Sequence, residues 1–245
     1  MKKQLFLLYG VVCYALFFVS FLYAYAFLAN LSFIPKSIDS GEVGGMTMAI
    51  LINIGLLGIF AVQHSVMARP AFKKQWTKFV PEPIERSTYT VLSALLLYLI
   101  FWQWQPMPEA VWDFAGSPVG YVLWAVFLSG MLLVLYSTFL IDHFDLFGLR
   151  QVVLYWQGKE YTHKPFKTPS LYKHMRHPLY LGWFLTFWGT PTMSQGHLLF
   201  AVVTTVYILL AIQIEERDLV GFFGDDYAQY QKRTSMVLPI PKKRS

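Results

Sequence analysis

Charged residues are absent from five long stretches of the sequence, and these stretches predict where its helices lie. The charge-free runs cover 4–35, 43–68, 87–108, 114–141 and 177–214. A helix needs about 20 apolar residues to cross about 30 Å of hydrocarbon, so each of the first four runs predicts one membrane-spanning helix. The last run holds 38 residues. As one helix it would reach about 57 Å, so we expect it to turn back on itself.

The middle of this last run carries the residues of a tight turn. The segment GTPTMSQG, at 189–196, holds two glycines and Pro191, which interrupt a helix. We therefore expect an all-α integral membrane protein with about five to six transmembrane helices, the last two forming a short helical hairpin. We predict a single domain with cytoplasmic cofactor-binding loops and a C-terminal helix. The domain covers 1–245, with spans at about 5–29, 44–67, 88–105, 118–141, 178–192 and 196–214 and a cytoplasmic tail at 215–245.

The composition supports a membrane protein and excludes several other classes. Hydrophobic residues make up 56% of the chain and charged residues 14%, with a mean hydropathy of +0.44. Soluble domains rarely have this composition. The single cysteine, Cys13, excludes a disulfide framework and a thiolate zinc site. The net charge is +6, but Lys and Arg lie at the ends of apolar segments, so no nucleic-acid partner is expected.

The positions of Lys and Arg predict the orientation in the membrane, because these residues collect on the cytoplasmic side. With a cytoplasmic N-terminus, four polar pieces hold 19 of the 20 basic residues and only Lys36 is outside. These pieces are 1–4, 68–87, 142–177 and 215–245. Six passes keep the basic tail at 242–244 inside, whereas five would place it outside. We expect a bacterial inner-membrane protein with both termini and its active site on the cytoplasmic side.

The segment LYKHMRHPLYLG, at 171–182, carries the most informative polar residues. Pro178 favours the first turn of a helix, which places Arg176 and His177 at a helix N-terminus. Free N–H groups and the helix dipole attract anions there, and the Arg176 guanidinium can hold a carboxylate through two hydrogen bonds. Alternatively, these two residues only mark the cytoplasmic interface.

Two adjacent carboxylates follow the last apolar helix. Glu215 and Glu216 return to the level of Arg176 and His177 if the hairpin turns near residue 196. The glutamates can then bind an ammonium group while Arg176 binds a carboxylate, as an amino-acid ligand requires. Alternatively, Arg176 pairs internally with Glu216. Neighbouring residues of a helix point about 100° apart, so we expect one glutamate to face a ligand.

These motifs resemble a known family. The combination of RHPLY at 176–180, an apolar hairpin, the two glutamates and GDDYAQYQKRTSMVLPIP resembles the isoprenylcysteine carboxyl methyltransferase and phospholipid methyltransferase superfamily of membrane enzymes. The resemblance covers the C-terminal part of the chain and implies S-adenosylmethionine (SAM) as the cofactor. The implied SAM-binding residues are Leu171, Tyr172, Arg176, His177, Pro178, Tyr180, Glu215 and Glu216.

A closer resemblance extends over the whole chain. Segments such as QHSVMARPAFK, DHFDLFGLRQV, LYKHMRHPLYLGW and FWGTPTMSQGHLLFA resemble the methanethiol S-methyltransferase branch of this superfamily, to which NnrU-like proteins are related. The resemblance implies methyl transfer from SAM to methanethiol, a small thiol, giving dimethyl sulfide and S-adenosylhomocysteine.

A base or a nearby cation is useful for thiol methylation, since the thiolate is the nucleophile. Asp142, His143 and Asp145 follow the fourth span, and His64 ends the second, so these four are the candidate catalytic residues. Adjacent side chains rarely hydrogen-bond to one another, so we expect a partner for His143 from another span. The candidate substrate-binding residues are Phe144, Phe147, Gln63 and Trp183. Interfacial anchoring of the histidines and core packing of the aromatic residues are the alternatives.

Other interpretations stay open at this point. A membrane SAM-dependent methyltransferase can act on a lipid or isoprenoid acceptor, and a non-enzymatic NnrU-like protein or transporter is a different class. No HExxH motif or carboxylate–histidine pattern suggests a metal, so none is expected. His163, His174 and His197 are assigned no role. The segment 219–230 can form an amphipathic helix that covers the cofactor. The sequence gives no oligomeric state.

Overall fold

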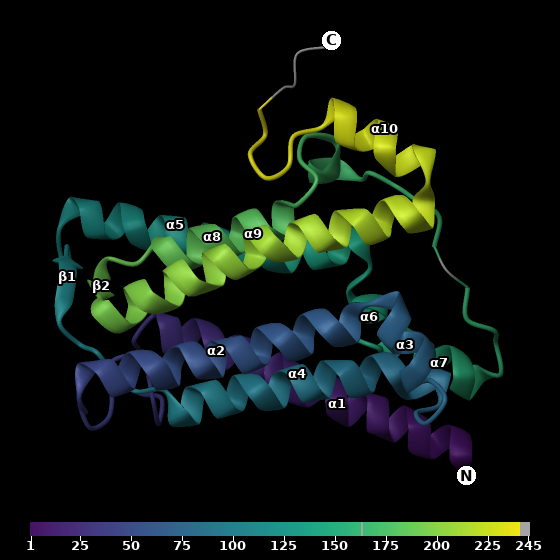
Figure 1. The fold of residues 1–245 in the computed structure, drawn as a ribbon, viewed down its shortest axis with the longest axis horizontal. Helices are drawn as coiled ribbons and strands as arrows, with labels where there is room; N and C mark the ends of the chain where they lie inside the picture. The colour runs from purple at the N-terminus through teal and green to yellow at the C-terminus, as the bar shows by residue number, and fades with distance from the viewer. Residues whose placement is uncertain (163, 241–245) are drawn as a thin grey trace. The chain divides into compact units, whose positions relative to one another are not determined.

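The computed structural model describes residues 1–162 and 164–240, so His163 and the basic tail at 242–244 lie outside the described residues. Helices dominate, and β1 and β2 form a two-stranded sheet. In chain order the elements are α1 (Lys2–Leu28), α2 (Met46–Ala68), α3 (Pro70–Trp76), α4 (Glu82–Gln103), β1 (Ala110–Asp113), α5 (Pro118–Ile141), α6 (His143–Leu146), α7 (Leu149–Gln157), the 3-10 turn η1 (Ser170–Lys173), α8 (Pro178–Trp188), β2 (Thr192–Ser194), α9 (Gln195–Phe223) and α10 (Asp225–Arg233) (Figure 1).

Five of the described helices, α1, α2, α4, α5 and α9, are long and apolar enough to cross a membrane. This confirms the expected all-α integral membrane protein. Two details differ from the expected spans. Helix α8 has 11 residues and ends at Trp188 rather than at 192, a length of about 16 Å. Helix α9 has 29 residues and continues past 214 to Phe223, because the charged residues that follow the apolar run also favour a helix.

Contacts divide the chain into two compact units, which are described separately. The expected single domain stays a prediction. Unit 1 comprises Met1–Val111, His143–Thr162 and Ser194–Val203, and unit 2 comprises Trp112–Asp142, His163–Met193 and Thr204–Ser245.

In unit 1, α4 packs against both α1 and α2, and α1 also packs against α7 (Figure 1). The α1–α7 approach depends on a small residue, since a Cβ at Gly10 would lie 2.5 Å from a methyl carbon of Val152. A polar contact fixes α2 to the segment after α4. The Asn53 amide donates to the Gln105 carbonyl (2.8 Å) and accepts from the Gln105 N–H (2.9 Å).

In unit 2, α5 and α8 cross at two glycines. A Cβ at Gly130 would lie 2.6 Å from the Gly182 carbonyl oxygen, and a Cβ at Gly182 would lie 2.8 Å from that of Gly130. Small residues at such a crossing let two membrane helices approach closely. This packing fixes α8, whose first residue follows the Arg-His pair.

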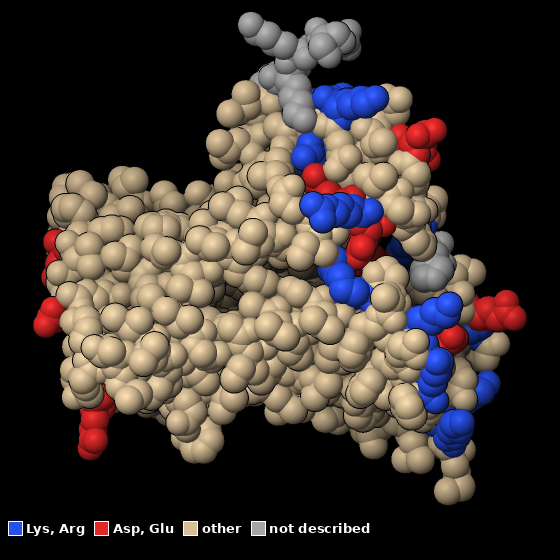
Figure 2. Space-filling model, in the orientation of Figure 1, with Lys and Arg blue, Asp and Glu red and all other residues tan. Residues whose placement is uncertain are grey.

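Charge is distributed unevenly along each unit. On the face in Figure 2, Lys and Arg of unit 2 gather around α10 and the end of α9, and those of unit 1 gather around α3 and α7. The middle of each unit's visible surface is uncharged. This is the pattern that membrane helices with basic loops at one end should give.

Candidate functional site

Helix α8 begins where the sequence predicts. Pro178 occupies its first turn, and His177, with φ −128° and ψ 61°, is the non-helical residue before it. The C-terminal segment fixes this start, because the N–H groups of Arg176 and His177 donate to the carbonyls of Ser235 and Met236, both at 2.9 Å. A parallel bridge between Met175 and Ser235 adjoins these bonds.

Arg176, His177 and Glu216 form a buried cluster, here called the ionic cluster. Glu216 Oε1 lies 2.5 Å from Arg176 Nε and 2.9 Å from His177 Nε2, and Glu216 Oε2 lies 3.2 Å from Arg176 Nη2. The three residues are 9%, 5% and 8% exposed. The turn in the last apolar run therefore brings Glu216 to the start of α8, as expected, and Arg176 pairs directly with Glu216.

The hydrogen-bonding capacity of Glu216 is fully used. A carboxylate offers about four acceptor positions. Arg176 takes two, His177 takes the third, and Gln231 Nε2 takes the fourth at 2.9 Å. Arg176 Nη1 also donates to the backbone carbonyls of Gln231 (3.1 Å) and Thr234 (2.5 Å). The pair thus joins α8, α9 and α10, and neither charge is left uncompensated.

The two adjacent glutamates have different partners, as helix geometry requires. Glu215 Oε2 accepts a hydrogen bond of 2.7 Å from the Tyr180 hydroxyl. The Tyr180 ring stacks on the His177 ring, with centroids 5.4 Å apart. Glu215 is therefore held by α8 one turn beyond the ionic cluster.

Tyr230 connects α10 to the segment before α8. The Tyr230 hydroxyl donates to the carbonyls of Tyr172 (2.5 Å) and Met175 (3.2 Å), and Leu171 opens this turn by accepting from the His174 N–H. Burial raises the pKa of Tyr230 to about 12 and also raises the pKa of Tyr172, on which the Glu215 charge acts in the same direction. Both phenols therefore stay neutral at physiological pH.

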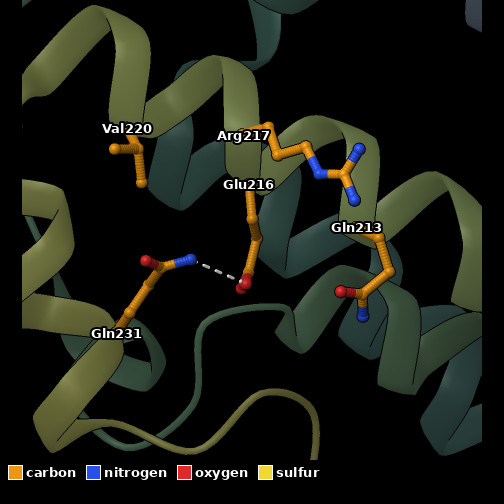
Figure 3. A pocket seen from close by; sticks show the side chains of 5 residues that line it. All are labelled: Gln213, Glu216, Arg217, Val220 and Gln231. Carbon is orange, nitrogen blue, oxygen red and sulfur yellow. Dashed lines mark hydrogen bonds between the residues drawn. The ribbon is translucent and has the colours of Figure 1, made fainter.

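A pocket of about 300 Å³ adjoins the ionic cluster (Figure 3). It is lined by Gln213, Glu216, Arg217, Val220 and Gln231. The first four lie on one face of α9 at spacings of three and four residues, and Gln231 comes from α10. Apart from Glu216, these residues are absent from the set expected from the sequence. Helix periodicity around Glu216 is the signal in the sequence that could have identified the other three residues on α9.

The expected base His143 lies in unit 1, inside an aromatic cluster formed with Tyr14, Phe17, Phe144 and Phe147. His143 is 4% exposed, and its Nε2 lies 2.7 Å from the Tyr14 hydroxyl. This is the expected partner from another span. The Phe147 ring lies 5.0 Å from the His143 ring and stacks on Phe17 at 3.9 Å. Phe144 packs edge-on against His143 at 5.3 Å and is half-exposed.

The two expected aspartates have basic partners. Asp145, in unit 1, accepts from Arg150 Nη1 at 2.9 Å and from the Tyr161 hydroxyl at 3.2 Å. Asp142, in unit 2, forms an ion pair with Lys164. Both carboxylates are therefore held in ion pairs. They lie in the segment that we expect on the cytoplasmic side.

The three remaining candidates, His64, Gln63 and Trp183, pack against residues of a neighbouring helix or of their own helix. In unit 1, the His64 ring lies 3.0 Å from the Tyr89 hydroxyl, and Gln63 accepts from the Ser93 hydroxyl at 3.2 Å. In unit 2, Trp183 stacks on Phe187 at 5.4 Å. All eight expected cofactor residues belong to unit 2, whereas most of the expected acceptor-side residues belong to unit 1.

The fold and this site define an all-α integral membrane protein with a buried ionic cluster beside a pocket of about 300 Å³ that is lined mainly by polar residues. Residues 52–236 match the family model described as "NnrU protein". The chain belongs to this family and, by whole-length similarity, to the methanethiol S-methyltransferases. The resemblance found in the sequence is thereby confirmed, and membership supports a methyltransferase function.

The similarity extends over all or nearly all of two methanethiol S-methyltransferases and over part of nurim. The chain is 51% identical over its whole length to the methanethiol S-methyltransferase of Crocosphaera subtropica, of which it covers 96%. It is 49% identical to that of Mycobacterium tuberculosis, with full coverage of both chains. It is 33% identical over 177 residues to nurim of Xenopus laevis, covering 68% of this chain and 61% of nurim. No solved structure matches the chain significantly.

Proposed function

We propose that this chain methylates methanethiol with SAM, producing dimethyl sulfide and S-adenosylhomocysteine. The observation that carries the proposal is the polar pocket at the ionic cluster, in a chain about half identical to proteins named methanethiol S-methyltransferase. SAM, when bound, supplies an electrophilic methyl group on a positively charged sulfur. The thiolate sulfur forms the new C–S bond as the sulfonium C–S bond breaks, and the thiol proton passes to a base.

The pocket residues fit the amino-acid end of SAM. That end carries an ammonium and a carboxylate, and the pocket, beside the Glu216 carboxylate, offers a guanidinium at Arg217 and amide groups at Gln213 and Gln231, whose carbonyl oxygens can accept from an ammonium. Its volume of about 300 Å³ is at the lower limit for ligand sites, so it suits this end rather than the whole cofactor. In this proposal the other cofactor-binding residues are Leu171, Tyr172, Arg176, His177, Pro178, Tyr180 and Glu215.

On the acceptor side, we propose that His143 takes the thiol proton. A neutral imidazole is a suitable base near neutral pH. The Tyr14 hydroxyl, 2.7 Å from Nε2, orients the ring. Asp142, Asp145 and His64 are secondary catalytic candidates, and the proposed substrate contacts are Phe144, Phe147, Gln63 and Trp183. Apolar walls suit the methyl group of methanethiol and exclude water from a reaction that neutralises charge.

The proposal includes a bacterial inner-membrane location with both termini cytoplasmic. A small apolar thiol can then reach the site from either the bilayer or the cytoplasm. Cysteine labelling in intact cells tests the orientation, with Cys13 first replaced by Ala. We expect Lys78→Cys to be protected from a membrane-impermeant maleimide and Glu42→Cys to react. The opposite pattern would invert the topology.

Headspace gas chromatography with mass detection tests the reaction. Purified protein in detergent receives methanethiol and SAM bearing a deuterated methyl group. We expect trideuterated dimethyl sulfide, and a Glu216→Ala variant should give far less. If SAM still binds but this product is absent, the acceptor is a lipid, an isoprenoid or a larger thiol rather than methanethiol. Absence of both SAM binding and product in the wild-type protein would favour a non-enzymatic NnrU-like role.

A further inference from the structure

The charged groups of the ionic cluster use their hydrogen bonds on one another and on nearby protein groups, so few hydrogen bonds remain for a ligand. All four acceptor positions of Glu216 are occupied, and the guanidinium of Arg176 gives two of its nitrogens to Glu216 and the third to backbone carbonyls. An anionic ligand group that used Arg176 would have to displace a buried carboxylate. A carboxylate bound in the adjoining pocket therefore needs another cation.

Arg217 is that cation. It lines the same pocket and is exposed, and its guanidinium makes no hydrogen bond or ion pair with the residues 1–162 and 164–240. Figure 3 shows the Arg217 side chain extending along α9 on the side of Gln213, whose amide lies one turn earlier. The five N–H donors of a guanidinium match the two oxygens of a carboxylate.

We infer that Arg217, assisted by Gln213, binds the α-carboxylate of the SAM amino-acid end. This inference rests on the proposed function and assigns the carboxylate to Arg217 rather than to Arg176. Arg176 then acts as a positioning residue, because it neutralises Glu216 and so removes the repulsion that a bound carboxylate would meet. Val220, one turn further along the same face, supplies an apolar contact for the methylene groups of the ligand.

Two ligands that differ only in the carboxylate test the inference. Isothermal titration calorimetry measures the Kd of SAM and of decarboxylated SAM for the wild-type protein, Arg217→Ala and Arg217→Lys. We expect the wild-type protein to prefer SAM by about 10- to 100-fold, the range of charge-assisted hydrogen bonds. Arg217→Ala should abolish this preference by weakening SAM alone. Arg217→Lys should keep part of it, because a charge remains without the planar geometry.

Arg233→Ala is the matched control. It removes the same charge from an exposed position of α10 in the same unit, outside the pocket lining, and should change neither Kd by more than about twofold. If Arg217→Ala weakens both ligands equally, or neither, the carboxylate assignment is overturned while SAM binding stands. If the wild-type protein binds neither ligand, the proposed function fails and this inference fails with it.

Discussion

The ionic cluster of unit 2 and the aromatic cluster of unit 1 hold their polar groups by different means. In the ionic cluster a guanidinium and a carboxylate, 40 residues apart, are buried together and joined to a histidine, a glutamine and backbone carbonyls. In the aromatic cluster an imidazole lies against a tyrosine hydroxyl among phenylalanine rings. Buried charges require compensation on every side, whereas a buried imidazole requires hydrogen-bond partners for its ring nitrogens and packing around the ring. Substitutions in the first should therefore affect stability, and substitutions in the second should affect turnover.

The largest effect is expected for Glu216→Gln. The amide keeps the shape of the side chain but leaves the buried Arg176 guanidinium without its counter-charge. We expect the free energy of unfolding to fall by about 3 kcal/mol and SAM binding to weaken, measured by thermal unfolding and calorimetry in detergent. Glu215→Gln is the control for the stability measurement, because it disturbs one hydrogen bond from Tyr180. Equal stability of the two variants would show that the ionic cluster is not a source of stability.

The second prediction concerns His143→Ala. Loss of a general base lowers turnover by about 10²- to 10⁴-fold. The expected cofactor residues all lie in unit 2, so we expect an unchanged Kd for SAM. The measurements are kcat from dimethyl sulfide release and the Kd from calorimetry. The exposed His174 provides the control, and His174→Ala should leave kcat unchanged. A His143→Ala variant with normal kcat, or with SAM binding weakened as much as kcat, would remove His143 from the acceptor side.

Gly182→Ala should have an intermediate effect on stability and on SAM binding, and it tests whether the α5–α8 crossing positions the ionic cluster. The added Cβ would lie 2.8 Å from the Gly130 carbonyl oxygen and 2.8 Å from the Val134 nitrogen, both backbone atoms. Helix α8 must therefore shift, at a cost of about 1–3 kcal/mol in unfolding free energy. SAM binding should weaken too, since the start of α8 carries Arg176 and His177.

Gly55→Ala is the control for this substitution, because nothing except its chain neighbours and the backbone of its own helix lies within 4 Å of a Cβ built there. Thermal unfolding of both variants is the measurement. Unchanged stability of Gly182→Ala would mean that the α5–α8 crossing is looser than the structure has it.

Much of the fold could be predicted because a membrane helix leaves a clear record in the sequence. Charge-free runs identified the helices that became α1, α2, α4 and α5, since charged groups are costly in hydrocarbon. The ends of α8 and α9 could not be placed in this way. The apolar run marks where the hydrocarbon ends, but α9 continues to Phe223 because Glu215 and Glu216 find partners and need no break in the helix.

The order of segments along the chain was enough to predict which residues of the site come together. The hydrogen bonds that each of them makes were harder to predict. A turn near 196 was enough to bring Glu216 to Arg176. The sequence could not show that these two residues would saturate one another, because that depends on Gln231 and Thr234 from the C-terminal segment. It could not select Tyr14 as the partner of His143 either, since the pairing joins residues 129 positions apart.

The smallest effect is expected for Tyr14→Phe, which removes one hydroxyl and leaves the ring packing of the aromatic cluster intact. A neutral hydrogen bond contributes about 0.5–1.5 kcal/mol, so kcat should fall by no more than about tenfold. If Tyr14 orients His143, the pH dependence of kcat should also shift, because the pKa of the imidazole responds to loss of this contact. Tyr98→Phe is the control, since the Tyr98 hydroxyl donates to the Leu16 carbonyl at 2.9 Å, and it should leave both kcat and its pH profile unchanged. A Tyr14→Phe enzyme with lower stability but an unaltered pH profile would make Tyr14 a packing residue only, and the two clusters would then differ in charge but not in role.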